Sequence, residues 1–393
     1  MASNIDTEQE LEQEQEQDGP SPVTSYRPEM NKYVDKTITR TRRKDVFTCK
    51  EDHVRVKVKR DTIRKGKGKR KKRGRRGASS QSSSQSKPKT KTKRRYRCLH
   101  LKDNRTKKQL QRLLNRRRVS KCVTAPNQRL SNCWFNTMFM SFFVSDKGYK
   151  FTKALRQIMI HGKRLNGTEL DEKMKLPFMQ LNAAVQASID CTNGRRYLLN
   201  NTNIMIEQIA RDLPDKYRDH TIFRVREPGG PLEYYRTLIN YLLQPHPNQY
   251  PYALFRGPQF LELLTNPKSV PLFQYGKNKT DPPDIIVGEI RGEMMSQISP
   301  RKKPLQFRLN NKYEYKLDSF ILANEEHYIS FHMIQGKEMG FDGASRSRLA
   351  PFKWRKQINT DKPFNLYKNK KSVKRWNFNF TKNQQFLIYF RTK

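Results

Sequence analysis

The chain has 393 residues, with 81 Lys or Arg against 37 Asp or Glu, and its formal net charge is +44 at pH 7. Such a surplus favours polyanionic partners such as DNA, RNA or an acidic protein surface. No run approaches the roughly 18 apolar residues of a membrane-spanning helix, and the acidic N-terminus is the reverse of a secretory signal. The sequence therefore predicts a soluble, intracellular protein without a membrane partner.

The first 118 residues hold little that can form a core. Residues 1–44 are acidic and then mixed, which predicts a disordered tail. Residues 45–63 include an alternating apolar and basic segment from Val54 to Val58, which predicts a short isolated strand that either docks elsewhere or stays loose. Residues 64–118 predict a basic, low-complexity arm and linker, with one short helix within 102–118.

The basic arm carries the candidate nucleic-acid-binding residues. Lys and Arg side chains that neutralise phosphates release counterions, which makes such binding steeply salt-dependent. Few aromatic residues interleave with these charges, which favours binding without sequence preference. The simpler interpretation is a solvated arm or a localisation signal. The candidates are Lys65, Lys67, Lys69, Arg70, Lys71, Lys72, Arg73, Arg75, Arg76, Arg94, Arg95 and Arg97.

Residues 119–393 are long enough, and apolar enough, for one substantial core. Apolar residues at helical spacing predict helices, and short apolar runs predict strands. The predicted helices cover 135–143, 204–213 and 232–243, and the predicted strands cover 284–287, 315–322, 327–334 and 385–390. Because the helices precede the strands, we expect an α+β fold with segregated layers.

The five cysteines are scattered and include no CxxC pair, so neither a disulfide framework nor a zinc ribbon is expected. No metal or other cofactor is expected either. Cys122 and Cys191 are interpreted as packing residues. His100 lies near Cys98, but two residues at that spacing lack the partners of a zinc site.

Cys133 lies where a polar loop turns into an apolar helix. Unpaired backbone N–H groups and the helix dipole favour the thiolate there. We expect Ser131 or Asn132 to cap the helix and Gln128 to offer its amide to an oxyanion hole. The alternative is that Cys133 is a buried helix-start residue and Gln128 a loop amide.

A second segment offers a base for this thiol. His327 begins a predicted strand, and Asp342 follows across a hairpin, where its carboxylate can lie beside one imidazole nitrogen. The other nitrogen then faces the nucleophile, which is the geometry that cysteine activation needs. His332 is interpreted as a core or surface histidine.

These segments resemble the cysteine and histidine boxes of the ubiquitin-specific proteases, within the papain-like cysteine peptidases. The matching stretches are Asn127 to Asn136, Leu317 to Tyr328 with Gly340 to Asp342, and the closing aromatic strand Gln385 to Arg391. The family usually has glycine where Glu326 stands and asparagine where Gln128 stands, and the paired CxxC motifs of its zinc-bearing region are missing.

The resemblance implies a papain-like α+β fold with an N-terminal helical part and a C-terminal antiparallel sheet, preceded by the disordered tail. It implies that Cys133 is the nucleophile, His327 the general base, Asp342 the orienting acid and Gln128 the oxyanion donor. The substrate would be ubiquitin or a ubiquitin-like protein, cleaved at its C-terminal amide bond.

The combination of a divergent peptidase core and a basic tail also resembles peptidase-like proteins of large DNA viruses, which implies a place in the host cytoplasm, the nucleus or the virion. The alternative function is a nucleic-acid-binding structural virion protein with an inactive peptidase-like scaffold. The two functions are compatible, because the tail can tether an active enzyme to nucleic acid or a virion.

Overall fold

The structure is a computed structural model. It describes residues 53–58, 95–116, 122–190, 199, 201–217, 225, 229–244, 252–265, 282–291, 303–324, 327–345, 348–366 and 377–392. The chain divides into two compact units, 1–46 and 47–393, and every described residue belongs to the second. The predicted tail and most of the basic arm lie outside the described residues. Within the described ranges, each helix is too short or too polar to span a bilayer.

The described part of the chain begins with a small hairpin and a helix. Strands β1 (His53–Val58) and β2 (Arg95–His100) pair antiparallel, so the strand predicted within 45–63 is not isolated. Helix α1 (Asn104–Leu114) follows, capped by the Asp103 side chain. Leu110 and Leu114 lie one turn apart on α1 and are buried in the main core. The folded part therefore starts before residue 119.

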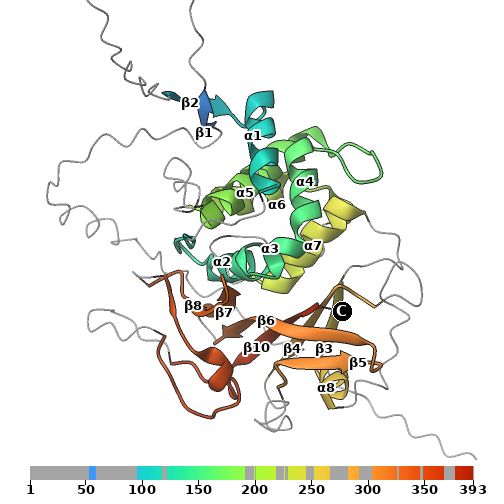
Figure 1. The fold of residues 1–393 in the computed structure, drawn as a ribbon, viewed down its shortest axis with the longest axis vertical. Helices are drawn as coiled ribbons and strands as arrows, with labels where there is room; N and C mark the ends of the chain where they lie inside the picture. Colours follow the sequence, from blue (N-terminus) through green and yellow to red (C-terminus); the bar gives the residue numbers. More distant parts are fainter. Residues whose placement is uncertain are drawn as a thin grey trace, which may run out of the picture. The chain divides into compact units, whose positions relative to one another are not determined.

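The helical layer comes next in the chain (Figure 1). It contains α2 (Cys133–Phe139), the π-helix η2 (Met140–Val144), α3 (Gly148–Phe151), α4 (Lys153–His161), α5 (Glu172–Asp190), α6 (Asn203–Asp212), the 3-10 helix η4 (Asp215–Tyr217) and α7 (Pro231–Leu243). The three predicted helices are confirmed. Helix α5 was not predicted, because it is buried on nearly all sides and contains Pro177, which leaves no amphipathic period.

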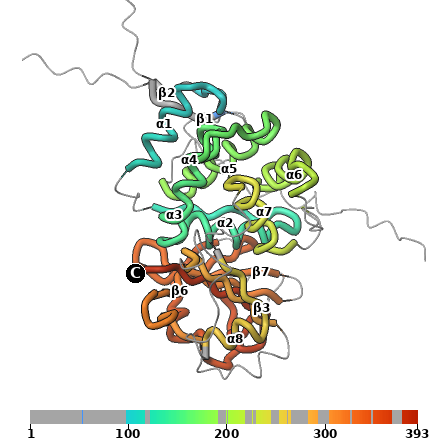
Figure 2. Tube along the Cα trace, turned by 90° about the vertical axis from the view of Figure 1, so that its right-hand side faces the viewer, coloured from blue at the N-terminus to red at the C-terminus, as the bar shows by residue number. Residues whose placement is uncertain are grey.

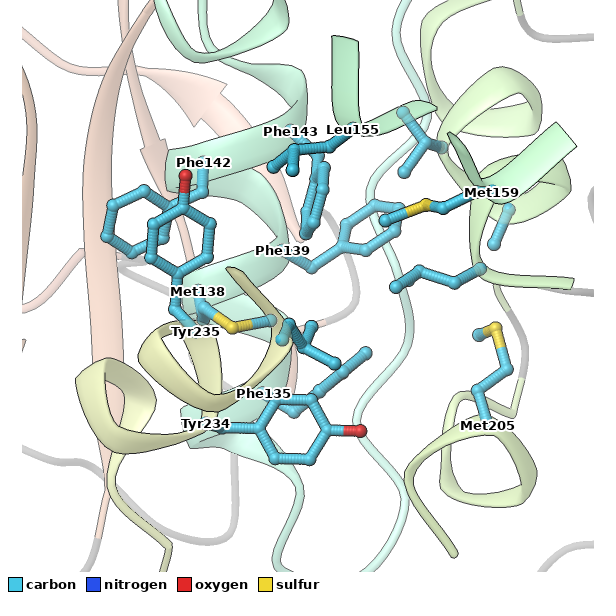
Figure 3. Packing of buried hydrophobic residues seen from close by; sticks show 14 of the residues in the cluster. Phe135, Met138, Phe139, Phe142, Phe143, Leu155, Met159, Met205, Tyr234 and Tyr235 are labelled. Carbon is cyan, nitrogen blue, oxygen red and sulfur yellow. The ribbon is translucent and has the colours of Figure 1, made fainter. Parts of the chain in front are cut away.

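The apolar face predicted after Cys133 is the centre of this layer (Figure 3). Phe142 stacks on Tyr235 of α7, with ring centroids 3.5 Å apart. Two turns earlier, Phe135 of α2 meets Tyr234 edge to face at 5.4 Å. Offset and edge-to-face pairs are favourable arrangements of aromatic rings, beyond the burial itself. They fix α2 against α7, and with it the position of Cys133.

The second layer is a sheet of eight strands. They are β3 (Tyr252–Arg256), β4 (Ile285–Ile290), β5 (Gln306–Leu309), β6 (Tyr313–Ala323), β7 (Tyr328–Ile334), β8 (Lys337–Phe341), β9 (Leu349–Pro351) and β10 (Gln384–Arg391). Their order is β3-β4-β10-β6-β7-β8-β9, and β5 pairs with β6. The predicted strands are confirmed.

The sheet is antiparallel except at one edge, where β3 and β4 run parallel. Helix α8 (Pro258–Thr265) lies between these two strands in the chain and supplies the crossover that a parallel pair requires. The expectation of a wholly antiparallel sheet is therefore wrong at this edge. Strand β3 and helix α8 were not predicted, because their apolar runs are short.

Both faces of the sheet are covered, as strand β10 illustrates. Phe386, Ile388 and Phe390 belong to the core shared with the helical layer. The alternate residues Leu387 and Tyr389 belong to a second core on the opposite face, with α8 and the 3-10 helix η6 (Trp354–Lys356). Successive side chains of a strand point to opposite faces, so one strand serves both cores. Figures 1 and 2 show the helical layer on one side of the sheet and α8 on the other.

The cysteines correct one expectation. Cys98 and Cys122 each take part in a disulfide bond, so Cys122 is not the packing residue expected. Pairing depends on Cα and Cβ positions, which the spacing of cysteines in a sequence does not give. Disulfide bonds persist mainly in oxidising surroundings, so they lend no support to a reducing intracellular setting. Cys191 lies outside the described residues. Cys133 is a free, buried thiol.

Candidate active site

Cys133 is the first residue of helix α2, at the end of a polar loop. The first N–H groups of a helix have no partner within it, so the thiol lies at the positive end of the helix dipole. Leu130, three residues before Cys133 in this loop, has a left-handed backbone with φ 59° and exposes 60% of its surface. Such a conformation is costly for leucine, and observed strain of this kind clusters at functional loops.

His327 lies directly before strand β7 and is almost completely buried. Asn324 makes two hydrogen bonds with the backbone of His327. The His327 backbone N–H donates to Asn324 Oδ1 at 2.7 Å, and the Asn324 backbone N–H donates to the His327 carbonyl at 3.1 Å. These two bonds fix the backbone of His327 at the start of strand β7, which contacts α2.

Asp342 follows strand β8 and binds the imidazole. Its Oδ1 lies 2.9 Å from His327 Nε2 and also accepts from the Ala344 backbone N–H at 2.9 Å. The Asp342 backbone N–H donates to the Arg348 carbonyl at 2.8 Å. These bonds hold Asp342 in place, and its carboxylate binds Nε2 of the His327 ring.

The imidazole also interacts with the Cys133 side chain. Burial lowers the pKa of His327, but its interactions with Asp342 and Cys133 outweigh burial and raise the pKa to about 9. An imidazole in this environment keeps its proton at neutral pH, when it lies between a carboxylate and a sulfur that can carry negative charge. The structure thus brings together a helix-start thiol, a buried imidazole and a carboxylate from three separate segments.

Gln128 lies in the same loop, half-buried. Its backbone N–H donates to the Gly343 carbonyl at 3.0 Å, which ties the loop before Cys133 to the segment after Asp342. Its side-chain Nε2 donates to the Leu130 carbonyl at 3.4 Å. The amide is near the thiol in the chain, but in this structure it is turned towards its own loop.

A buried polar network behind Cys133 was not predicted. Asn132 was expected to cap α2, but its side chain makes no capping bond. Its Oδ1 accepts from the Arg129 backbone N–H at 3.0 Å, and its Nδ2 donates to Thr202 Oγ1 at 2.9 Å and to Asn203. Asn136, one turn further on, joins the network through Thr202. The amide bridges two elements instead of capping one.

This network holds the loop in place. Asn203 Nδ2 donates to the Arg129 carbonyl at 3.1 Å, so both backbone groups of Arg129 are bonded to buried amides. Fully satisfied buried polar networks give a single rigid arrangement. The spacing of Asn132 and Asn136 by one helical turn was the available signal, but nothing in the sequence linked it to Thr202 and Asn203.

His332 differs from His327 in every partner. It is fully buried in strand β7, with Ser330 Oγ 2.8 Å from Nε2 and Ser319 Oγ 3.3 Å from Nδ1. Burial lowers its pKa to about 3, so it stays neutral. His332 is a core histidine, and it lies outside the Cys133 site.

The remaining candidates fall mostly outside the description. Lys65 to Arg94 lie outside the described residues. Arg95 and Arg97 belong to strand β2, and only their backbone is described. Throughout the described ranges, no group of three or more His, Cys, Asp or Glu side chains is arranged to hold a metal ion.

No protein-family model matches the sequence, and no curated protein matches it. Among solved structures, the chain is similar to the SAGA DUB module Ubp8/Sgf11/Sus1/Sgf73 bound to monoubiquitin, with a TM-score of 0.42, 10% identity, and coverage of 71% of this chain and 72% of the other. It is also similar to the same module bound to ubiquitin aldehyde, with a TM-score of 0.41, 10% identity, and coverage of 69% and 70%. These likenesses are distant, and no activity is taken from them. They lend no support to a viral source or to nucleic-acid binding.

Proposed function

We propose that the chain is a cysteine peptidase in which Cys133 is the nucleophile, His327 the general base and Asp342 the group that orients His327. The observation that carries this proposal is one buried imidazole that is hydrogen-bonded to Asp342 and has its pKa raised by both Asp342 and Cys133. The triad of a nucleophile, a base and an orienting acid is recognised by such geometry rather than by sequence position.

In the first half of the reaction, His327 holds the proton that Cys133 has given up, and the thiolate attacks the carbonyl carbon of the scissile amide. The carbonyl oxygen becomes an oxyanion, which the backbone N–H of Cys133 stabilises at the start of α2. Gln128 adds a second donor once its amide rotates away from the Leu130 carbonyl. His327 then gives its proton to the departing amine, and a thioester remains on Cys133.

In the second half, water attacks the thioester. His327 takes a proton from that water, the carbon–sulfur bond breaks, and the carboxylic acid product leaves. Asp342 keeps the imidazole in one orientation throughout and stabilises its protonated form. The substrate class that we propose is the C-terminal amide bond of ubiquitin or a ubiquitin-like protein, on the strength of the cysteine and histidine boxes.

The test is reaction with a ubiquitin C-terminal electrophile, followed by mass spectrometry. We expect a covalent adduct on Cys133 that is absent in Cys133→Ala and strongly slowed in His327→Ala. The matched control is His332→Ala, which removes another buried histidine of the same hairpin. A small thiol reagent is used in parallel: if it labels Cys133 at an ordinary thiol rate and the ubiquitin probe does not react, the deubiquitinase assignment is wrong.

A second proposal concerns the basic arm. The Lys and Arg residues from 64 to 97 favour binding to nucleic acid through phosphates, which would tether the enzyme to a genome or a virion. We expect the affinity of the full chain for DNA to fall steeply as salt rises, and to be lost when residues 64–97 are deleted. Unchanged affinity after the deletion would remove this proposal without affecting the peptidase.

A further inference from the structure

A pocket of about 350 Å³ opens beside the parallel edge of the sheet. Three segments line it: Glu233 of α7, Arg256 to Pro258 from the end of β3 to the start of α8, and Glu289 and Arg291 at the end of β4. None of these residues stood out in the sequence, because they come from three distant segments. Two acidic and two basic side chains in one pocket suggest recognition of a charged group.

The pocket lies next to the Cys133 site. Cys133 and Glu233 each precede an aromatic residue, and the rings of those two residues, Trp134 and Tyr234, are in contact with centroids 5.3 Å apart. Tyr328, which directly follows His327, is within electrostatic range of Cys133 as well as of Glu233, Glu289 and Arg291. A substrate chain bound across the thiol therefore has the pocket within reach.

The carboxylates of the pocket are already used. The Glu289 side chain is only 2% exposed, and it binds Arg256 Nε at 3.2 Å, Arg291 Nε and Gln384 Nε2 at 2.9 Å. Glu233 Oε1 accepts from Arg256 Nη2 at 2.7 Å. With three charged or amide donors, Glu289 has little capacity left for an additional cation. The acidic side chains thus position the arginines instead of recruiting a basic ligand.

The guanidinium groups, in contrast to the Glu289 carboxylate, are exposed to solvent. The side chains of Arg256 and Arg291 are 53% and 61% exposed. Each guanidinium has five N–H donors, and the bonds to Glu233 and Glu289 use only some of them. Within the described part of the chain, these two arginines have no other acceptor. The pocket is neutral in total, but the charge that it offers to solvent is positive.

We propose that Arg256 and Arg291 form a subsite for an acidic side chain of the protein substrate, close to the scissile bond. An arginine held by a buried carboxylate is pre-oriented for a carboxylate ligand, which accepts charge-assisted hydrogen bonds in the fork geometry of a guanidinium. The assignment rests on the proposed peptidase function, because it takes Cys133 as the point at which the substrate chain is cleaved.

Binding to the Cys133→Ala chain tests the subsite without requiring turnover. Fluorescent peptides are compared in pairs that differ only by Asp or Asn at one position, scanned along the peptide. We expect one position at which Asp binds at least about fivefold more tightly than Asn. Arg256→Gln with Arg291→Gln should abolish this advantage. No such position, or an advantage that persists in the double variant, overturns the proposal.

The matched control is Arg105→Gln. Arg105 is similarly exposed, at 59%, and is paired with Asp103, but it lies on α1. This variant should leave the Asp advantage unchanged. Thermal unfolding checks that the pocket variants are folded. If the double variant does not fold, Arg291→Gln alone carries the test, because Glu289 keeps its contacts with Arg256 and Gln384.

The two proposals fail in different ways. If the wild-type chain cleaves peptides but shows no preference for an acidic residue, the subsite is wrong and the peptidase stands. Suppose instead that the Cys133→Ala chain binds Asp peptides selectively, but the wild-type chain neither cleaves them nor reacts with electrophiles. The peptidase proposal is then wrong, and the pocket for acidic side chains stands.

Discussion

Two buried histidines, one just before strand β7 and one within it, lie in opposite electrostatic environments. His327, just before the strand, has its pKa raised to about 9, because a carboxylate and a thiol offset the cost of burial. His332, inside the strand, has its pKa lowered to about 3, because its partners are serine hydroxyl groups that carry no charge. Burial is nearly equal at the two positions. The charge of the neighbouring groups therefore decides which histidine can act as a base.

The largest expected effect is on catalysis when each histidine is replaced in turn. His327→Gln should lower kcat/KM by at least about 10³-fold, because Cys133 loses the base that activates it. His332→Gln should change kcat/KM by less than about threefold once the folded fraction is accounted for. Steady-state kinetics on a ubiquitin amide substrate measures both. Equal losses in the two variants would show that the contrast between the histidines has no catalytic meaning.

Asp342→Asn should have the next largest effect. The amide keeps the shape of the side chain but lacks the charge that raises the His327 pKa, so kcat should fall by about 10²- to 10⁴-fold. The His327 pKa should also move down, which an NMR titration of the imidazole detects. A fall in kcat without any movement of that pKa would mean that Asp342 acts through the fold and not through the imidazole.

The pH dependence of stability should differ in sign between the histidines. The folded-state pKa of His332 is below its unfolded value of about 6.5, so its contribution is present above pH 6.5 and is lost as pH falls towards 3. Between pH 6.5 and 5 this amounts to about 2 kcal/mol. The folded-state pKa of His327 is raised, so its contribution is present below pH 6.5 and is lost as pH rises through about 9.

Denaturant unfolding at a series of pH values measures both windows. Relative to the wild-type chain, His332→Gln should flatten the loss of stability below pH 6.5. For His327, the wild-type chain is compared with His327→Gln, because Cys133 is one of the groups that raise the imidazole pKa and has to be present. Parallel curves for each pair of chains would contradict the assigned pKa directions.

The smallest expected effect comes from Ser330→Ala, which, like Asp342→Asn, changes the partner of one ring nitrogen. Here the partner is a neutral hydroxyl, so only the buried hydrogen bond of His332 is lost. We expect a loss of about 1 to 2 kcal/mol in the free energy of unfolding and no change in kcat. A fall in kcat at unchanged stability would place His332 in the catalytic machinery after all.

The sequence alone determined the local features of this protein. The aromatic period after Cys133 predicted the helix that begins at that thiol, and the apolar runs ending at Leu322 and Ile334 predicted the β6–β7 hairpin. Both depend on the side-chain periods of 3.6 and 2 residues, which a sequence records directly. The thiol, the imidazole and the carboxylate were named in the same way, from their places at the ends of these elements.

The tertiary structure decided everything that depends on distant segments meeting. The amide network that holds the loop before Cys133 and the pocket of Arg256 and Arg291 each join residues far apart in the chain. The same holds for the difference between His327 and His332, since a pKa depends on the charges and the solvent within a few ångströms of the group. Proximity of this kind follows from how the helical layer packs on the sheet, and no local period encodes it.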